Sequence, residues 1–399
     1  MIWQRAVALV NATVVTDQGL SDSVRFTSRI LSIGERPCRT DLVIDAADGF
    51  VLPGLINAHD HLELNHYRRL KFAERYCNAS EWIEDMRPRL QTDPAIREAQ
   101  AKPLADRVFI GAIKNILSGV TTVAHHNPFY RELRGLPLRV LRRYGWAHSF
   151  YLQDGPAGAR GEPGGNIRSA FEATPHDAPF FVHLGEGVDA AAHDELRKLA
   201  QLGALVERTV LVHGVAIDRR GWRRVADAGA SLVWCPASNN FLFGQTIDFT
   251  RFVGGNVALG TDSRLTGSRD LLEELRIAYE SSMIERANLL PMVTTTAANV
   301  IRQPQLGRLQ VGGPADLILV PRVGHDPIDA VLATSRRDLD LVVLAGRVMT
   351  AGLAHRNIFA ARRVTPQVAV VDEVSKYVDP VLATRIAACS IHEPGVSVA

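Results

Sequence analysis

Apolar residues follow two patterns along this chain. In roughly the first fifty residues, and again late in the chain, valines, isoleucines and leucines alternate with polar residues at a period of two, which is typical of strands. The strands expected from this pattern cover residues 7–15, 25–33, 42–46, 315–321 and 339–344. Because strand-rich stretches at the two ends of a chain can pair, we predict that residues 1–52 and 310–364 together form a small composite β-sandwich domain.

Between these stretches, residues 53–309 contain apolar strand-like runs that alternate with helical patterns, as in βαβ units. Seven strands are readable, in the segments VLPGLINAHDH, VTTVAHHN, GWAHSFYLQ, PFFVHLGEG, TVLVHGVAI, ASLVWCPAS and NVALGTDS. A (β/α)8 barrel requires eight strands in about 250 residues, and this part of the chain has that length. The fourth strand is not visible between Gln153 and Pro179, where glycines and prolines are frequent. The pattern therefore predicts an α/β fold, a distorted (β/α)8 TIM-type barrel with eight strands or with seven.

Helices are expected where apolar residues recur at helical spacing between these strands. They cover residues 166–173, 189–201, 219–228 and 271–285. A further helix is expected over 372–388, within a C-terminal tail of residues 365–399 to which the sequence assigns no function.

Ionisable residues stand at the ends of several barrel-type strands. His59 and His61 end the first strand, and because alternate residues of a strand share a face, both imidazoles are expected at the carboxyl-end mouth of the barrel. His183, His213 and Asp262 each follow four or five apolar residues in the same way. A single such residue is more often a satisfied core or rim group, because burying it alone is unfavourable. Five of them at strand ends indicate shared chemistry, and imidazoles with a carboxylate suit zinc or iron(II).

Composition narrows the class of protein. The chain has 399 residues, 46% apolar and 22% charged, and its net charge of +2 gives no indication of nucleic-acid or membrane binding. Its four cysteines are far apart, and no apolar run approaches the roughly 20 residues of a membrane helix. The N-terminal stretch has the alternation of a strand rather than the features of a signal peptide. We therefore expect a cytoplasmic enzyme with a small-molecule substrate. If the protein forms an oligomer, a homodimer is the most common form.

The motifs PGLINAHDH, HLGE, VHG and GTDS, in this order, resemble those of the amidohydrolase superfamily. The most similar branch contains the aminohydrolases of nucleobases and related heterocycles, namely cytosine, guanine and adenosine-type deaminases and the triazine hydrolases. The resemblance extends over nearly the whole chain. It includes TDSRLTGSRDLLEELR, which is similar to the last barrel strand and helix of the family, and LGRLQVGGPADLILV, which is similar to the return into the β-sandwich.

The resemblance implies a role for each matching residue. The ligands of one divalent metal ion, Zn²⁺ or Fe²⁺, would be His59, His61, His183 and Asp262. A bound divalent ion can lower the pKa of water from about 15.7 to about 7. Glu186 would move a proton from the attacking water to a ring nitrogen or leaving group. His213 would polarise the water or the developing oxyanion, and Asp262 would belong to the catalytic set as well as to the ligands.

The same resemblance distinguishes mononuclear from binuclear members of the superfamily. Binuclear members bridge two metals with a carboxylated lysine near the middle of the barrel. This sequence has no lysine between Lys114 and Lys198. A single metal ion is therefore expected.

Residues on the substrate side are assigned from their positions near these motifs. They are Glu63, Asn65, Trp82, His125 and Gln153. Aromatic residues such as Trp82 are more often packing groups. Arg264 is interpreted as a group for an anionic substituent or, more simply, as a surface arginine, and Asn239 as a structural residue.

The leading hypothesis is hydrolytic deamination of an amino-substituted heterocycle by a metal-activated water. The alternative within enzymes is hydrolysis of a related C–N or C–X bond, in a cyclic amide or a triazine-like substrate. A non-catalytic scaffold that keeps only the fold is the third hypothesis. None of the expected ligands is missing from the sequence, which argues against a scaffold.

Overall fold

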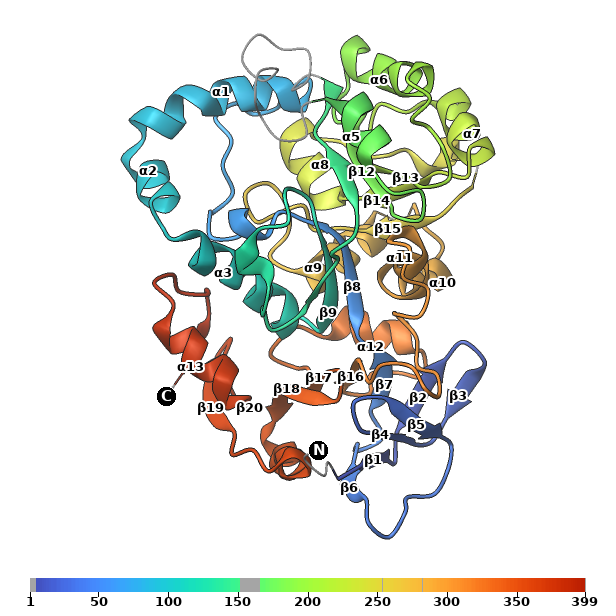
Figure 1. Cartoon of the computed structure of the whole chain (residues 1–399), viewed down its shortest axis with the longest axis vertical. Coiled ribbons are helices and arrows are strands. Elements are labelled where there is room, and N and C mark those ends of the chain that lie inside the picture. Colours follow the sequence, from blue (N-terminus) through green and yellow to red (C-terminus); the bar gives the residue numbers. More distant parts are fainter. Residues whose placement is uncertain (1–4, 151–165, 253, 282, 399) are drawn as a thin grey trace.

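The computed structural model describes residues 5–150, 166–252, 254–281 and 283–398 (Figure 1). Its central part contains two sheets with only parallel ladders, ordered β10-β9-β8 and β11-β12-β13-β14-β15. Their strands are β8 (Leu55–Asp60), β9 (Val120–His125), β10 (Arg139–Val140), β11 (Gly145–Ala147), β12 (Phe180–Leu184), β13 (Thr209–His213), β14 (Ser231–Trp234) and β15 (Val257–Leu259). An isolated parallel bridge between Asp60 and Asp262 joins the end of β8 to the segment after β15. This is a TIM-barrel-like α/β arrangement, although no ladder joins β10 to β11 within the described residues.

The strand missing from the sequence pattern lies elsewhere than expected. β11 pairs directly with β12, from Gly145 opposite Phe180 to Ala147 opposite Val182, so no strand lies between them. The additional strand is β10, which pairs with β9 ahead of β11. It is only two residues long, and so short a strand produces no apolar run. The expected position between Gln153 and Pro179 was therefore wrong.

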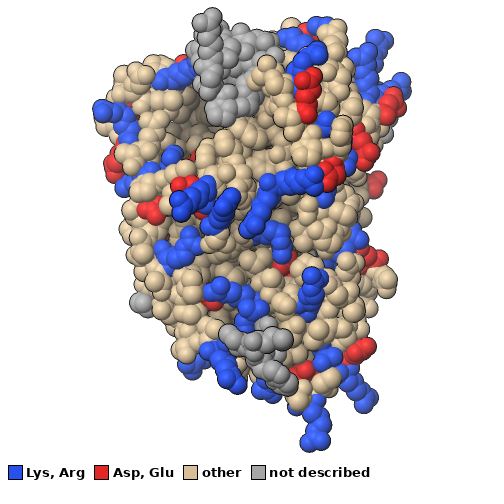
Figure 2. Space-filling view, in the orientation of Figure 1, with Lys and Arg blue, Asp and Glu red and all other residues tan. Residues whose placement is uncertain are grey.

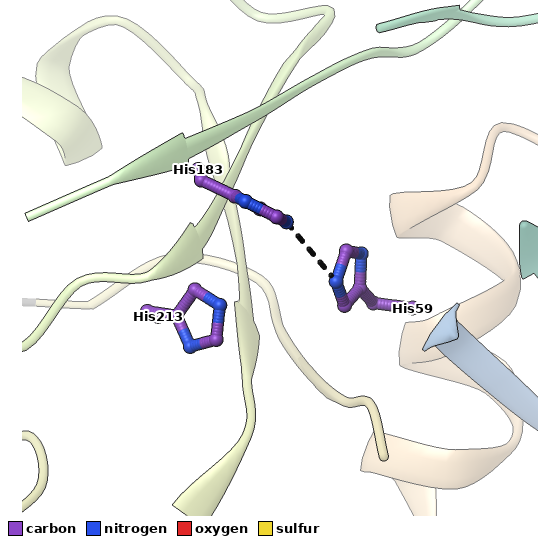
Figure 3. Close-up of side chains that lie close together, drawn as sticks. All are labelled: His59, His183 and His213. Carbon is purple, nitrogen blue, oxygen red and sulfur yellow. Dashed lines mark hydrogen bonds between the residues drawn. The ribbon is translucent and has the colours of Figure 1, made fainter. Parts of the chain in front are cut away.

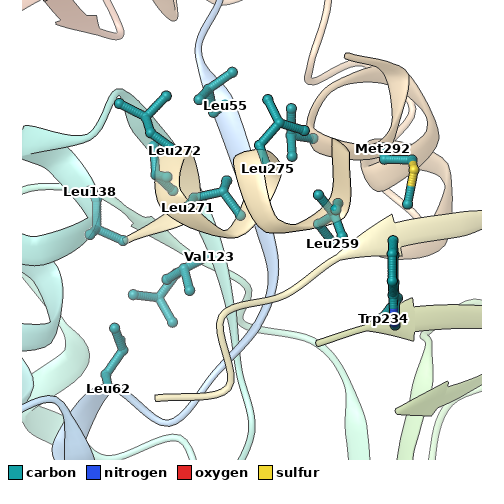
Figure 4. Close-up of a cluster of buried hydrophobic side chains, with 14 of the residues drawn as sticks. Leu55, Leu62, Val123, Leu138, Trp234, Leu259, Leu271, Leu272, Leu275 and Met292 are labelled. Atoms are coloured by element: carbon teal, nitrogen blue, oxygen red, sulfur yellow. The ribbon is translucent and has the colours of Figure 1, made fainter. Parts of the chain in front are cut away.

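Helices follow most of the strands, and the four expected between strands are confirmed as α5 to α7 and α9, with α9 shorter than expected. The helices of this part are α1 (Ala79–Thr92), α2 (Pro94–Gln100), α3 (Leu104–Leu117), α5 (Ile167–Ala173), α6 (Ala190–Gln201), α7 (Arg219–Asp227), α8 (Pro236–Phe243), α9 (Leu271–Glu280), α10 (Arg286–Leu289) and α11 (Thr295–Val300). Short 3-10 turns are η1 (Leu62–Leu64), η2 (Arg131–Leu133), η3 (Phe249–Arg251) and η4 (Pro291–Val293). In α9 the Asp270 side chain caps the first turn, and Leu271 and Leu275 belong to the same apolar cluster as Leu55 of β8 and Leu259 of β15 (Figure 4).

Strands from both ends of the chain meet in one sheet. The nine-stranded sheet has the order β21-β19-β20-β18-β17-β16-β7-β2-β3, in which β19 (Gln367–Val371), β20 (Val374–Val378) and β21 (Val396–Val398) come from the C-terminal tail. A four-stranded sheet has the order β5-β4-β1-β6. The strands are β1 (Val7–Val10), β2 (Thr13–Thr16), β3 (Gly19–Ser21), β4 (Val24–Phe26), β5 (Ile30–Ile33), β6 (Leu42–Asp45), β7 (Phe50–Pro53), β16 (Leu317–Val320), β17 (Leu341–Leu344) and β18 (Arg347–Gly352), with α12 (Pro327–Ala333) and the 3-10 segment η5 (Leu353–Arg362) between them. Antiparallel pairing of β7 with β16 joins the two ends of the chain. Leu9 and Phe26 of the four-stranded sheet share an apolar cluster with Leu317 and Leu341 of the nine-stranded one.

The C-terminal tail differs from the single helix expected over 372–388. Its elements are β19 (Gln367–Val371), β20 (Val374–Val378), α13 (Pro380–Ala388) and β21 (Val396–Val398). Asp372 and Glu373 have φ angles of 46° and 70°, which turn the chain into a hairpin between β19 and β20. The helix begins only at Pro380, where the Asp379 carboxylate accepts hydrogen bonds from the first-turn amides. The alternation in VSKYV was therefore a strand signal that the helical interpretation overlooked.

A buried ion pair attaches this tail to the barrel part. Arg264 donates two hydrogen bonds to Glu393, Nη1 to Oε2 at 2.8 Å and Nη2 to Oε1 at 2.6 Å, and Arg336 pairs with the same carboxylate. Only 9% of the Arg264 side chain and 1% of the Glu393 side chain are exposed. Arg264 is therefore neither a surface arginine nor free to bind an anionic substituent, and both interpretations of it were wrong.

We expect Glu393→Ala to lower the free energy of unfolding by about 3–5 kcal/mol, because Arg264 would remain buried without its counter-charge. Urea denaturation measures this loss. Glu207→Ala is the matched control, since Glu207 pairs with Arg302 while 82% of its side chain is exposed, and its loss should be about 1 kcal/mol at most. Equal effects of the two substitutions would contradict a stabilising role for the Arg264–Glu393 pair.

The surface carries both signs of charge. On the face seen in Figure 2, lysines and arginines extend across the middle of the molecule, and acidic residues lie among them. Among the described helices, none combines the length and the apolar composition needed to cross a bilayer.

Candidate metal centre and active site

The two histidines of the first barrel-type strand lie together at its carboxyl end. The rings of His59 and His61 have centroids 5.0 Å apart, and 0% and 6% of the two residues are exposed. The segment after β15 is hydrogen-bonded to them through its backbone. The amide of His61 donates to the carbonyl of Asp262 at 2.6 Å, and the amide of Asp262 donates to the carbonyl of His59 at 3.1 Å. This exchange fixes Asp262 beside both imidazoles.

The Asp262 carboxylate presents one oxygen to these histidines. Its Oδ2 accepts hydrogen bonds from the hydroxyls of Ser238 at 2.8 Å and Thr266 at 2.6 Å. Its Oδ1 lies 3.6 Å from Nε2 of His59 and 3.5 Å from Nε2 of His61. The residue has a φ of 57°, a left-handed conformation that is rare outside glycine and is typical of constrained sites.

His183 reaches the same point from β12. Its Nε2 lies 3.3 Å from Nε2 of His59, and the two rings meet edge to face (Figure 3). One nitrogen or oxygen from each of His59, His61 and Asp262 lies within 4.8 Å of the others, and the same holds for His59, His183 and His213. Burial lowers the pKa of His59 to about 4 and that of His183 well below its usual value, because it penalises the charged imidazolium. The donor set of neutral imidazoles and one carboxylate fits a divalent cation.

His213 and Glu186 stand at the side of this cluster. Nδ1 of His213 is 2.8 Å from Oδ1 of Asn239, an acceptor, so Nδ1 holds the proton and the lone pair is on Nε2. Among the described residues, Nε2 has no hydrogen-bond partner, and it lies 3.5 Å from Oε1 of Glu186. Oε2 of Glu186 is 3.9 Å from Nδ1 of His183. Burial raises the pKa of Glu186 well above its usual value, and the charges of Asp262 and Glu195 raise it further.

A second group of histidines adjoins the first. His126, His148 and His183 have ligand atoms within 4.8 Å of one another. The rings of His126 and His183 are stacked, with centroids 4.3 Å apart and an interplanar angle of 20°. Each ring nitrogen directs its lone pair in the plane of its ring, so two stacked rings do not direct their lone pairs at one metal ion. We therefore group His183 with His59, whose Nε2 lies 3.3 Å from that of His183, rather than with His126. The sequence interpretation missed His148, because the strand was read through it to Gln153 although β11 ends at Ala147.

The residues expected on the substrate side differ in how they lie relative to the histidine cluster. Glu63 is near the cluster: its carboxylate accepts a hydrogen bond from Asn127, and its buried Oε2 has no hydrogen-bond partner among the described residues. His125 is 1% exposed, and its Nδ1 lies 3.7 Å from Oε2 of Glu63. Trp82 donates to the carbonyl of Leu70 at 3.0 Å and packs in a small apolar cluster. Gln153 lies outside the described residues.

Asn65 does not face the histidine cluster as a free group. It is 1% exposed, its amide donates to Oδ1 of Asp60 at 2.7 Å, and its oxygen accepts from Lys114 at 2.7 Å and from the amide of Arg264 at 3.1 Å. Its hydrogen-bonding groups are occupied within the protein. A substrate contact at Asn65, as expected from the sequence, would have to replace one of these hydrogen bonds.

Comparisons with known proteins indicate one family and one fold. Residues 166–349 match the amidohydrolase family. A 5-methylthioadenosine/S-adenosylhomocysteine deaminase from Pyrococcus furiosus is 26% identical over 332 residues, which are 70% of this chain and 77% of the relative. Atrazine chlorohydrolase from Arthrobacter aurescens, crystallised with zinc, has a TM-score of 0.68 at 22% identity and covers 86% of this chain and 95% of its own. An adenosine deaminase from Xanthomonas campestris with bound zinc has a TM-score of 0.64 at 17% identity, with 90% and 97% covered.

The structural similarities show a shared fold, and the sequence similarities support an aminohydrolase enzyme that acts on C–N bonds. The resemblance of this chain to the amidohydrolase superfamily, and within it to the deaminase and triazine hydrolase branch, is thereby confirmed.

Proposed function

We propose that this protein is a metal-dependent hydrolase that deaminates an amino-substituted heterocycle. The observation that supports this most is the position of Glu186, a buried carboxyl group with a raised pKa that lies 3.5 Å from His213 and 3.9 Å from His183. Hydrolytic deamination needs an acid that holds a proton near neutral pH and releases it to a leaving nitrogen. Glu186 meets this requirement beside a cluster of potential metal ligands.

One divalent ion would be held by four residues. These are His59, His61, His183 and Asp262. The fit is supported by the neutral imidazoles and by the orientation of Asp262, whose other oxygen is occupied by two hydroxyl groups. When bound, such an ion supplies a water of lowered pKa as the nucleophile. Zinc is the ion we propose, since two relatives of this fold were crystallised with it, and iron(II) suits the same donors.

The residues of the chain move the protons of the reaction. Glu186 donates the proton that it holds to a ring nitrogen and then takes the first proton of the attacking water, which it passes to the leaving amine. It finally takes the second proton from the oxygen that becomes the carbonyl, and so ends the reaction protonated, as it began. The oxygen of the water forms a bond to the ring carbon, the C–N bond breaks, and ammonia leaves. The lone pair on Nε2 of His213 accepts a hydrogen bond from the attacking water, and Asn239 fixes the tautomer that this requires.

Glu63 is the residue that we propose for recognition of the substrate. Its buried Oε2 has no hydrogen-bond partner among the described residues, and burial raises its pKa. A ring N–H or an amino group of the substrate would satisfy this oxygen. Asn127 holds the other oxygen and also contacts Nδ1 of His61 at 3.3 Å, so that the substrate contact is linked to the proposed metal site.

We also propose a division of the chain into units. Residues 53–309 form the catalytic unit, residues 1–52 and 310–364 form a composite β-sandwich, and residues 365–399 form a tail. Pairing of β7 with β16 supports the composite unit. Pairing of β20 with β18 adds the strands of the tail to the same sheet.

A second candidate function is hydrolysis at the same kind of carbon with a leaving group other than an amine. The fold similarity to an atrazine chlorohydrolase favours this candidate. The proposed acid and ligands would be the same, and only the departing group would differ. A scaffold without catalysis, the third hypothesis from the sequence, is not supported, since relatives similar in sequence are named as deaminases.

We expect metal-replete enzyme to release ammonia from at least one member of a panel of aminated pyrimidines, purines, pterins and triazines. Coupled detection of ammonia measures this directly. Chlorinated triazines, with detection of chloride, form the parallel arm for the second candidate. Release of chloride, or opening of a cyclic amide, without ammonia from any aminated ring would refute deamination and favour that candidate.

A further inference from the structure

A lysine lies buried within the protein next to the candidate metal centre. Lys114, in the second half of α3, is 0% exposed. Its Nζ lies 3.2 Å from Oδ2 of Asp60, donates to Oδ1 of Asn65 at 2.7 Å and donates to Oγ1 of Thr261 at 2.8 Å. These three oxygen acceptors suit the three N–H groups of an ammonium. Lys114 is therefore fully satisfied, in a position where an unpaired charge would be strongly unfavourable.

Two of these partners are adjacent in sequence to proposed metal ligands. Asp60 stands between His59 and His61, and Thr261 directly precedes Asp262. The first pair of ligands belongs to the end of β8, and Asp262 follows β15, so the residues are about two hundred positions apart in the chain. One ammonium group thus joins the two backbone segments that provide three of the four ligands.

Asparagine side chains complete this network. The Asp60 carboxylate accepts from Nδ2 of Asn115 at 2.7 Å and of Asn57 at 3.1 Å, as well as from Asn65. Nδ2 of Asn57 also donates to Oγ1 of Thr261 at 2.8 Å, and its Oδ1 accepts from the amide of Thr261 at 3.1 Å. Side-chain hydrogen bonds therefore join β8 to the segment after β15, in addition to the backbone bridge between Asp60 and Asp262.

We infer that Lys114 is a positioning residue for the metal centre: it sets the register between the end of β8 and the segment after β15, and so brings His59, His61 and Asp262 to one point. This inference rests on the proposed function, because it assumes that these residues bind a divalent ion. Lys114 touches neither the ion nor the substrate and acts through Asp60 and Thr261. Residues that orient metal ligands typically contribute 10- to 100-fold to metal affinity.

A role in charge compensation alone makes a different prediction. If Lys114 only neutralises Asp60, then removing both charges should restore both the stability and the metal affinity. If Lys114 sets the register through Thr261 and Asn65 as well, the double variant should regain stability without regaining the affinity for metal. The two roles are therefore separable by measuring melting temperature and metal affinity on the same set of proteins.

The experiment compares wild type, Lys114→Met, Asp60→Asn/Lys114→Met and Lys376→Met. Lys376 is the matched control, because it is also buried, at 2% exposed, and lies in β20 of the nine-stranded sheet, where it donates to the carbonyl of Leu339. The dissociation constant for Zn²⁺ is measured by competition with a chelator, well below each melting temperature. The absorption spectrum of the Co²⁺-loaded proteins reports the geometry of the site.

We expect the dissociation constant to rise about 10- to 100-fold in Lys114→Met and to stay raised in the double variant, whose melting temperature recovers. The Co²⁺ spectrum should change in both, and Lys376→Met should lose stability with its metal affinity unchanged. A double variant with wild-type affinity would overturn the inference, even if Lys114→Met alone fails to fold. Wild-type protein that binds no divalent ion would instead refute the proposed function, and the inference with it.

Discussion

Glu186→Gln should reduce kcat for ammonia release by about 10²- to 10⁴-fold, the usual contribution of a positioned acid or base. Glutamine keeps the size of the side chain and its hydrogen bonds but cannot accept a proton from water and return it to nitrogen. Because Glu186 is not among the four proposed ligands, the variant should retain its metal. Steady-state kinetics and metal analysis of the same preparation test both parts of the prediction.

A neighbouring carboxyl group provides the control. Glu195 is 8% exposed, and its Oε2 accepts a hydrogen bond from the amide of Gly185 at 2.6 Å. Glutamine at this position can accept the same hydrogen bond through its amide oxygen. Glu195→Gln should therefore lose far less activity than Glu186→Gln. Full activity of Glu186→Gln on every substrate that the wild type deaminates would contradict the role of Glu186 as the proton carrier.

His183→Ala should remove the bound metal and, with it, all measurable hydrolysis. His183 supplies the ligand that β12 brings to the cluster, and its Nε2 lies 3.3 Å from that of His59. Without it, two histidines and one carboxylate remain, and the site loses a nitrogen donor that no other proposed ligand replaces. Inductively coupled plasma analysis after gel filtration should give about one ion per wild-type chain and a small fraction of that in the variant.

The control for this substitution is a histidine away from the site. His176 is exposed, between α5 and β12, and His176→Ala should keep the metal and the activity of the wild type. Circular dichroism of both variants checks that the fold is retained. If His183→Ala kept a full complement of metal, the ion would be held by other residues and the proposed ligand set would be wrong.

Much of the candidate site could be predicted because its residues lie where parallel strands end. His59, His61, His183, His213 and Asp262 each follow an apolar run, and such runs are strand signals in a single sequence. Parallel strands place their carboxyl ends at one edge, so residues far apart in the chain meet there. The structure brings these five together, while their roles as ligands and catalysts remain a prediction.

The parts that could not be predicted depend on contacts with no local signal. β10 is too short to show an apolar run, and His148 follows a strand whose end was placed too late. Lys114 occurs in a helix whose periodicity says nothing about a buried acceptor such as Asp60. Glu393 pairs with Arg264 across 129 positions, which no short-range pattern reveals.

The central claim is that one divalent ion is bound by His59, His61, His183 and Asp262. The most direct test is a crystal structure of the zinc-loaded protein, with anomalous diffraction recorded on both sides of the zinc absorption edge. We expect one strong anomalous peak enclosed by these four side chains, within about 2.0–2.2 Å of their nitrogen and oxygen atoms. A peak bonded instead to His126 and His148, or one without Asp262 among its ligands, would contradict the account.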